Sequence, residues 1–161
     1  MGMSATAEVL FGVDLGNPEV DEWNFELEDY ALPAPWDGDE APEWDDLISE
    51  FGGWHEADLP WGDRGSAQYE ARSEQYKREL AVRRATGINY GSYGYELGGT
   101  YLHIGPVQRA EWGCEPLTPL DGPDAADIAR LRGFLIFLDG KGLRLKADFR
   151  EPRWLLAATY G

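Results

Sequence analysis

Charge is distributed very unevenly along this chain, and this limits how its first part can fold. No lysine or arginine occurs before Arg64, whereas 18 of the 30 Asp and Glu residues lie within residues 1–63. The other 12 acids share residues 64–161 with all 14 Lys and Arg residues. The acidic front, as we call residues 1–63, has no cation of its own. Its carboxylates must therefore face solvent, a partner, or arginines that come later in the chain.

The acidic front is also rich in tryptophan. It contains five of the seven tryptophans, namely Trp23, Trp36, Trp44, Trp54 and Trp61. Unfolded segments are poor in aromatic residues, so the front is not merely a soluble tail. A chain of 161 residues has the usual size of one folded domain. We therefore expect a single domain over 1–161, with an irregular acidic, Trp-rich segment at 15–63 and a helix–hairpin–helix–hairpin body at 64–161.

Runs of strand-forming residues indicate the β-structure. They predict five strands, at residues 7–14, 88–97, 100–109, 143–150 and 154–160. Gly98-Gly99 joins the second strand to the third and favours a tight hairpin turn. Gly91 and Gly94, inside the second strand, indicate a bulge or a place where another backbone passes closely. The strand at 143–150 is expected to be half exposed because apolar and charged residues alternate along it.

Two longer segments have helical patterns. Ser66 is a plausible N-cap for a helix that ends near Ala85, before Gly87. A second main helix is predicted from about Pro123 to just before Gly140, and a short helix at 42–51. The expected fold class is therefore α+β, with about five mostly antiparallel strands, two main helices packed on one face, and the irregular acidic excursion.

Net charge and cysteine content restrict the partners and the compartment. The formal net charge of −16 opposes direct binding to nucleic acid or to anionic lipid, and it favours encounter with basic proteins. Cys114 is the sole cysteine, so no intramolecular disulfide can form and a reducing compartment is favoured. No apolar run approaches the roughly 20 residues that a membrane span needs. We expect a cytoplasmic protein that contacts neither membranes nor nucleic acid and needs no cofactor.

One short motif suggests metal chemistry. Residues 11–16, Phe-Gly-Val-Asp-Leu-Gly, resemble the first strand of the ribonuclease H-like and actin-like folds. The resemblance implies that Asp14 holds a divalent metal or lies beside phosphates, as in a metal-dependent hydrolase or nuclease. In those families the strand leads into further apolar strands, whereas here Asn17-Pro18 follows. The alternative is that Asp14 ends a strand and begins a turn.

Other candidate groups have equally ordinary alternatives. A cysteine nucleophile can be activated by a histidine base, and Cys114 and His103 have these residue types. A histidine on an apolar strand is, however, more often a packed residue. The hairpin region carries aromatic rings that are suited to base stacking or to cross-strand packing, at Tyr90, Tyr93, Tyr95 and Tyr101. We predict no catalytic residue and no metal ligand from these patterns.

The two ends of the chain resemble a group of viral proteins. Residues 7–16 and 152–161 are similar to the termini of small acidic proteins encoded by bacteriophages of actinobacteria. This resemblance implies a protein made inside an infected bacterium. Small acidic phage products of this kind often bind and inhibit host or defence proteins, sometimes by imitating DNA.

These observations predict a non-enzymatic binding or inhibitor protein. Its acidic front would occupy a basic surface, such as the nucleic-acid site of a host or defence protein, with charge setting the rate of encounter and aromatics the residence time. The expected binding residues are Trp23, Trp36, Asp37, Asp39, Glu40, Glu43, Trp44, Asp45, Asp46 and Trp54. The prediction requires the carboxylates of the front to lie together on one outer face. The alternatives are the metal-dependent hydrolase that uses Asp14, and a structural protein whose acids only maintain solubility.

Overall fold

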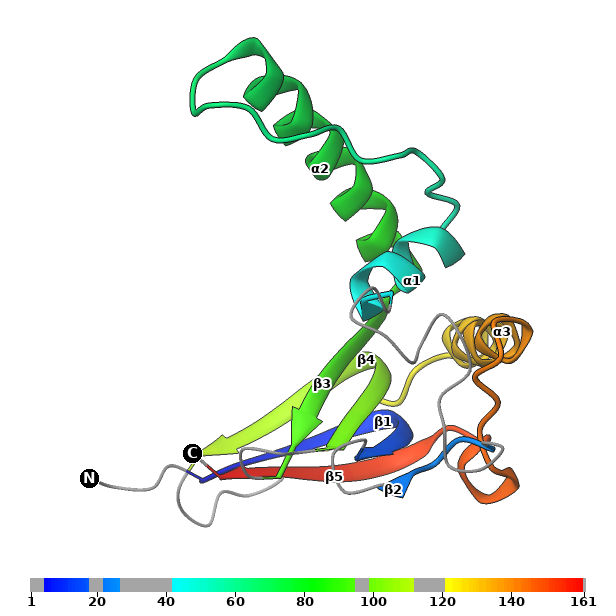
Figure 1. Ribbon diagram of the computed structural model, residues 1–161. Helices are drawn as coiled ribbons and strands as arrows, with labels where there is room; N and C mark the ends of the chain where they lie inside the picture. The colour runs from blue at the N-terminus through cyan, green and yellow to red at the C-terminus, as the bar shows by residue number, and fades with distance from the viewer. Residues whose placement is uncertain (1–4, 18–21, 27–41, 95–98, 112–120, 161) are drawn as a thin grey trace. The chain divides into compact units, whose positions relative to one another are not determined.

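The computed structural model describes residues 5–17, 22–26, 42–94, 99–111 and 121–160 (Figure 1). The chain divides into two compact units. Residues 1–41 and 88–161 form the sheet unit, and Pro42–Gly87 form the helical unit. The boundary at Pro42 cuts through the predicted acidic segment 15–63, so that segment is shared between the two units.

The sheet unit is built around one long central strand. In the described part of the chain the strands are β1 (Ala5–Asn17), β2 (Glu22–Trp23), β3 (Ile88–Tyr93), β4 (Gly99–Glu111) and β5 (Arg153–Tyr160). β1 pairs with β4 along one edge and with β5 and β2 along the other, and β3 lies outside β4. All of these pairs are antiparallel, and the predicted α+β class is confirmed.

The sheet curls so that its two outer strands meet at one end. The Gly94 amide donates to the Ala158 carbonyl at 2.7 Å, and Gly94 forms a parallel bridge with Thr159. The Thr159 hydroxyl also donates to the Ser92 carbonyl at 3.2 Å. The backbone that was expected to pass close to Gly94 is therefore that of β5.

Alternation along the strands gives the sheet two buried faces. Leu10, Tyr101 and Ala157 are buried together on the inner face of the curl. Val13 lies opposite Leu102, and both are buried on the other face. Because both faces are covered, small changes in the backbone of β1 affect two layers of packing.

Helix α3 (Ala125–Gly140) packs within the sheet unit, where it contacts β4. The Asp124 side chain caps it by accepting a hydrogen bond from the Asp127 amide at 2.8 Å. Its buried residues, Leu131, Phe134 and Leu138, recur at three- and four-residue spacing. The predicted helix is confirmed, and it begins two residues after Pro123.

The predicted strand at 143–150 is wrong. Leu143 and Leu145 are buried and Arg144 is exposed, as the alternation indicates, but among the described residues the segment pairs by a single bridge between Leu145 and Phe25. Residues Ala147–Phe149 then form a 3₁₀ turn. The alternation reflects two leucines reaching the core from an irregular segment.

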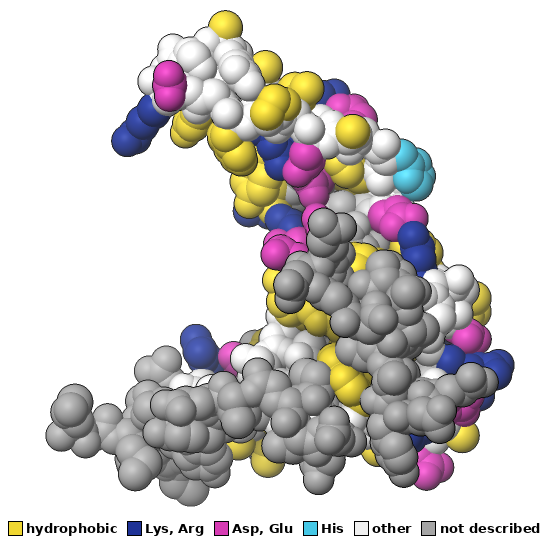
Figure 2. Space-filling model, in the orientation of Figure 1, with side chains coloured by type: hydrophobic (Ala, Val, Ile, Leu, Met, Phe, Trp, Pro, Cys, Tyr) yellow, Lys and Arg dark blue, Asp and Glu magenta, His cyan; other side chains and the backbone are white. Residues whose placement is uncertain are grey.

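The helical unit contains α1 (Trp44–Phe51) and α2 (Ala67–Thr86). Ser66 caps α2 as predicted, accepting a hydrogen bond from the Tyr69 amide at 3.1 Å, and Gly87 ends it with a positive φ of 69°. Figure 2 shows apolar, acidic and basic side chains interspersed on the surface of this unit. The two main predicted helices therefore belong to different units, α2 to the helical unit and α3 to the sheet unit.

None of the described helices has both the length and the apolar character that a membrane span requires.

Candidate functional site

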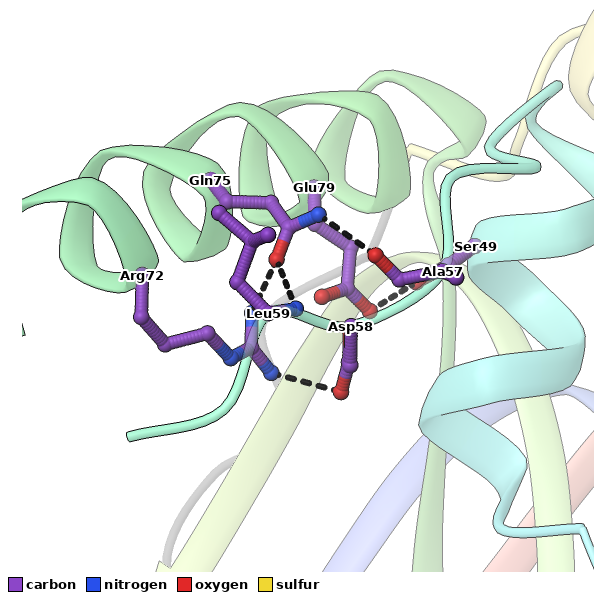
Figure 3. A network of polar contacts seen from close by, with 7 residues as sticks. All are labelled: Ser49, Ala57, Asp58, Leu59, Arg72, Gln75 and Glu79. Atoms are coloured by element: carbon purple, nitrogen blue, oxygen red, sulfur yellow. Dashed lines mark hydrogen bonds and ion pairs between the residues drawn. The ribbon is translucent and has the colours of Figure 1, made fainter. Parts of the chain in front are cut away.

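Helix α2 is unusual in what it buries. The residues that it shields from solvent are polar, namely Arg72, Gln75, Glu79 and Thr86. A helix without an apolar stripe needs other partners to be stable. The chain between α1 and α2 supplies them, because residues 56–61, which we call the strap, run back along the helix (Figure 3).

The Gln75 side chain links α2 to the backbone of the strap. Its Oε1 atom accepts a hydrogen bond from the Leu59 amide at 2.9 Å, and its Nε2 atom donates to the Ala57 carbonyl at 2.9 Å (Figure 3). The Arg72 guanidinium donates to the same Oε1 atom at 3.2 Å. Gln75 therefore satisfies an amide and a carbonyl of the strap, which belongs to no helix or strand.

Ion pairs hold the strap on either side of Gln75. Arg72 Nη2 lies 2.6 Å from Asp58 Oδ2, with 8% of the Arg72 side chain exposed. Arg78 contacts both carboxylate oxygens of Glu56 at 3.2 Å. These contacts use two acids of the front to fix the strap in place, and they neutralise both acids.

We expect Gln75→Ala to loosen the strap. The substitution removes both strap hydrogen bonds of a buried side chain and leaves the Leu59 amide without this acceptor, which should cost about 1–3 kcal/mol. Amide hydrogen exchange at Leu59 and urea unfolding would measure the effect. Gln68→Ala is the matched control, because Gln68 makes an exposed 3.3 Å bond to the Pro60 carbonyl. Equal effects of the two substitutions would contradict this role of Gln75.

The strap and α2 together present an aromatic patch, formed by Leu59, Trp61, Tyr69 and Tyr76. Trp61 is 56% exposed, and Leu59 and Tyr76 are also exposed. The Trp61 ring lies 5.5 Å from that of Tyr69, and the Arg72 guanidinium lies over it at 5.3 Å. Tyr69, Arg72 and Tyr76 occur at helical spacing along one face of α2. The Trp61 ring is thus held by contacts with Tyr69 and with a buried arginine.

The structure places the predicted binding residues in three different settings. Trp36, Asp37, Asp39 and Glu40 lie outside the described residues. Trp23 belongs to the sheet unit, where its ring packs 5.2 Å from that of Phe25. The remaining residues are brought together in the helical unit, and they are Glu43, Trp44, Asp45, Asp46 and Trp54.

Within the helical unit these residues are not equally accessible. Asp45 pairs with Arg83 at 2.5 Å, and Trp54 is half-buried with the Arg78 guanidinium 5.7 Å above its ring. Glu43 and Asp46 are exposed, and neither forms an ion pair with the residues that the structure describes. Two of the predicted acids therefore remain open to a partner.

Several acids of the front are neutralised by arginines from later in the chain. The ion pairs are Glu8–Arg109, Glu26–Arg144, Glu26–Arg150, Asp45–Arg83, Glu56–Arg78 and Asp58–Arg72. These five carboxylates do not form one unpaired outer wall, contrary to the expectation from the sequence. The negative charge that remains for a partner is correspondingly smaller.

Asp14 accepts two hydrogen bonds within the sheet unit. Its Oδ1 atom accepts from the Tyr93 hydroxyl at 2.8 Å and from the Gly16 amide at 2.9 Å. Asp14 lies within β1, which continues to Asn17, so the strand does not end at Asp14 as the alternative supposed; the bond to Gly16 instead spans an irregularity in the pairing of β1 with β4. Among the described residues, no three His, Cys, Asp or Glu side chains gather as a metal site would require.

His103 and Tyr101 lie side by side on the inner face of the sheet, with ring centroids 5.9 Å apart. Burial lowers the pKa of His103, and its Nδ1 atom is buried without a hydrogen-bond partner among the described residues. Burial, together with a hydrogen bond to Glu8, raises the pKa of Tyr101 well above its usual range. Both groups are therefore neutral near pH 7. Cys114, the residue considered as a partner of His103, lies outside the described residues.

The predicted tyrosine cluster is divided between packing and exposure. Tyr93 and Tyr101 pack on the inner face of the sheet, whereas Tyr90 is exposed. Tyr95 lies outside the described residues.

Sequence reasoning missed three residues of the aromatic patch as binding candidates, namely Leu59, Trp61 and Tyr76. A signal for Tyr76 was present, since Tyr69 and Tyr76 are two helical turns apart in a segment otherwise dominated by charged residues. No comparable signal existed for Leu59, whose exposure depends on the path of the strap.

Comparison of the chain with protein-family models, with curated proteins and with solved structures finds no match. Its function is therefore inferred from its own residues, among which the aromatic patch is the feature most typical of a binding surface.

Proposed function

We propose that this protein is a non-enzymatic binding protein whose helical unit contacts the basic surface of a partner protein through the aromatic patch. The observation that supports this most directly is the exposure of Leu59, Trp61 and Tyr76 on one small unit. Exposed apolar side chains on one unit are typical of protein interfaces, in which aromatic residues are the usual anchors.

The patch is already ordered, which favours binding. Tyr69 and the Arg72 guanidinium fix the position of Trp61, and Gln75 and Asp58 fix the strap beside it. A side chain that is held in its binding position loses less conformational entropy when a partner docks. Two apolar residues of α1, Leu47 and Ile48, are also buried.

Charge favours a basic partner. Residues 42–87 contain ten Asp and Glu against six Lys and Arg, a net charge of −4. Glu43, Asp46 and Asp63 are exposed without ion pairs to described residues. Such charges accelerate encounter with a positive surface more than they strengthen the complex. The pairing of other acids with arginine favours contact led by the aromatic patch over imitation of a DNA duplex.

The resemblance of the two chain ends to actinobacteriophage proteins suggests where the partner is found. On this proposal, the protein acts in the cytoplasm of an infected actinobacterium and occupies a basic surface of a host or defence protein. Direct binding to nucleic acid is disfavoured, because the net charge of −16 would repel phosphates.

Capture from an actinobacterial lysate at low and high salt tests the proposal. We expect the wild-type chain to retain a basic protein at low salt and less of it at high salt. Trp61→Ala should weaken that interaction by about 30-fold, since truncation of an aromatic anchor costs about 2 kcal/mol or more. Titration of the purified partner against both proteins would give the ratio of dissociation constants.

Leu156→Ala is the matched control. Leu156 is 71% exposed but belongs to β5 of the sheet unit, so its truncation should leave binding unchanged. Equal binding by Trp61→Ala and wild type would reject the aromatic patch as the contact surface. Failure of the wild type to retain any partner would favour the alternative in which the acids serve solubility alone. Retention that is indifferent to salt would reject a basic partner.

A further inference from the structure

The sheet unit carries a concentration of positive charge that the binding proposal does not use. Residues 130–153 contain seven of the 14 Lys and Arg residues of the chain but only three of its 30 acids. In a chain with a net charge of −16, this segment is locally cationic. It comprises the second half of α3 and the irregular segment that leads to β5.

This cationic segment surrounds a pocket of about 200 Å³. Its polar wall includes three arginines, Arg132 from α3 and Arg144 and Arg150 from the segment that follows. Its apolar wall is formed by Leu135, Ile136 and Leu145. Ile136 is 73% exposed although it lies beside these guanidinium groups, so the pocket has an uncovered apolar rim.

The three arginines differ in how closely the described residues hold them. Arg150 donates from Nε to the Leu145 carbonyl and from Nη2 to Glu26, both at 2.5 Å. Toward the described residues, the ion pairs of Arg144 are long, with its Nε 3.4 Å from Asp139 and 3.9 Å from Glu26. Contacts of this length are weaker than a well-aligned charge-assisted hydrogen bond, so an anion with better geometry can displace them.

Two carboxylates, Asp139 and Glu151, line the pocket beside the arginines, and both are exposed to solvent. Arg132 pairs with Glu151 at 2.7 Å, and the Glu151 side chain is 74% exposed. Ion pairs between exposed side chains are weak because water screens them. A ligand that presents several oxygens could accept hydrogen bonds from more than one arginine at once, so it would bind them more strongly than a single carboxylate does.

We propose that this pocket binds a small phosphate monoester, with the phosphate between the arginines and a short apolar group against Leu135 and Ile136. A phosphate dianion offers three oxygens to converging guanidinium groups, whereas a carboxylate satisfies one arginine fork. The small volume excludes a large ligand, and the apolar wall distinguishes the ester from the free ion. The pocket belongs to the sheet unit and the aromatic patch to the helical unit, and the two are proposed to bind different kinds of ligand. The phosphate proposal and the partner-binding proposal can therefore fail independently.

Titration of the isotope-labelled full chain with phenyl phosphate, followed by NMR, tests the proposal. We expect saturable shifts confined to the residues around the pocket, with inorganic phosphate binding at least about threefold more weakly because it lacks the apolar contact. Arg144→Gln should weaken phenyl phosphate binding about tenfold or more. Arg132→Gln, which alters a different ion pair, provides a second variant should Arg144→Gln perturb the fold.

Lys141→Gln is the control, because it removes the same charge nearby from a residue that does not line the pocket. Its affinity for phenyl phosphate should stay within about twofold of wild type. An equal loss in Lys141→Gln and Arg144→Gln would overturn the proposal in favour of a general electrostatic field. Absence of saturable shifts up to about 10 mM ligand would overturn it outright. Equal affinity for phenyl phosphate and inorganic phosphate would overturn the proposal that the apolar wall binds the ester group.

Discussion

Replacement of Gly12 by alanine is expected to destabilise the sheet unit by about 3 kcal/mol or more. A Cβ atom at Gly12 would lie 1.9 Å from the Leu102 carbonyl oxygen and 2.9 Å from the Cα atom of His103. Both are backbone atoms of β4, so no side-chain rotation relieves the overlap. The two strands would have to move apart, and β1 would also lose register with β5, to which it pairs at the same residue.

Gly140→Ala is the matched control for this prediction. A Cβ atom at Gly140 meets nothing within 4 Å, and alanine favours helix over glycine by up to about 1 kcal/mol. Urea unfolding followed by circular dichroism would compare the two variants, with amide exchange in β1 as a local measure. Stability of Gly12→Ala close to that of wild type would contradict the close approach of β1 and β4.

Phe134→Ala is expected to cost about 3–5 kcal/mol. Phe134 is fully buried on α3, and its ring stacks on that of Phe137 at 5.7 Å. Its removal leaves a cavity that neighbouring side chains can fill only in part. Thermal and urea unfolding of the purified variant would measure the loss.

Ile136→Ala on the same helix provides the comparison. Because Ile136 is exposed, its truncation should change the free energy of unfolding by less than about 0.5 kcal/mol. A similar loss in both variants would contradict the orientation of α3, since only one face of this helix is buried. The same variant also reports on the apolar wall of the phosphate pocket.

The elements that were predicted correctly have local signals. Ser66 accepts the bond of an N-cap, and Gly87 has the positive φ that follows a helix, both as the residue types indicate. The antiparallel pairing of β3 with β4 follows from two strand-forming runs close together in sequence. Residues 143–150 were mispredicted because alternation reports which side chains are buried, whereas a strand also requires a partner edge.

The candidate site was harder to predict because it depends on long-range contacts. Asp45 and Glu26 have no cation near them in sequence, yet Arg83 and Arg150 reach them in the folded chain. The sequence showed that the front lacked local counter-ions, but it could not show which later arginines would return to it. The exposure of Trp61 likewise depends on the strap, whose path is fixed by Gln75 from another element.

The meeting of β3 with β5 has a consequence for how the protein behaves at high concentration. β5 is almost entirely apolar, and an uncovered strand of that composition is a template for fibril growth. Here β1 pairs with β5 at eight positions, and the Gly94 amide donates a hydrogen bond to the Ala158 carbonyl near the C-terminal end of β5. The fold thus holds one edge of β5 in the sheet and occupies one carbonyl of its other edge, which leaves less of this apolar strand available for pairing with another chain.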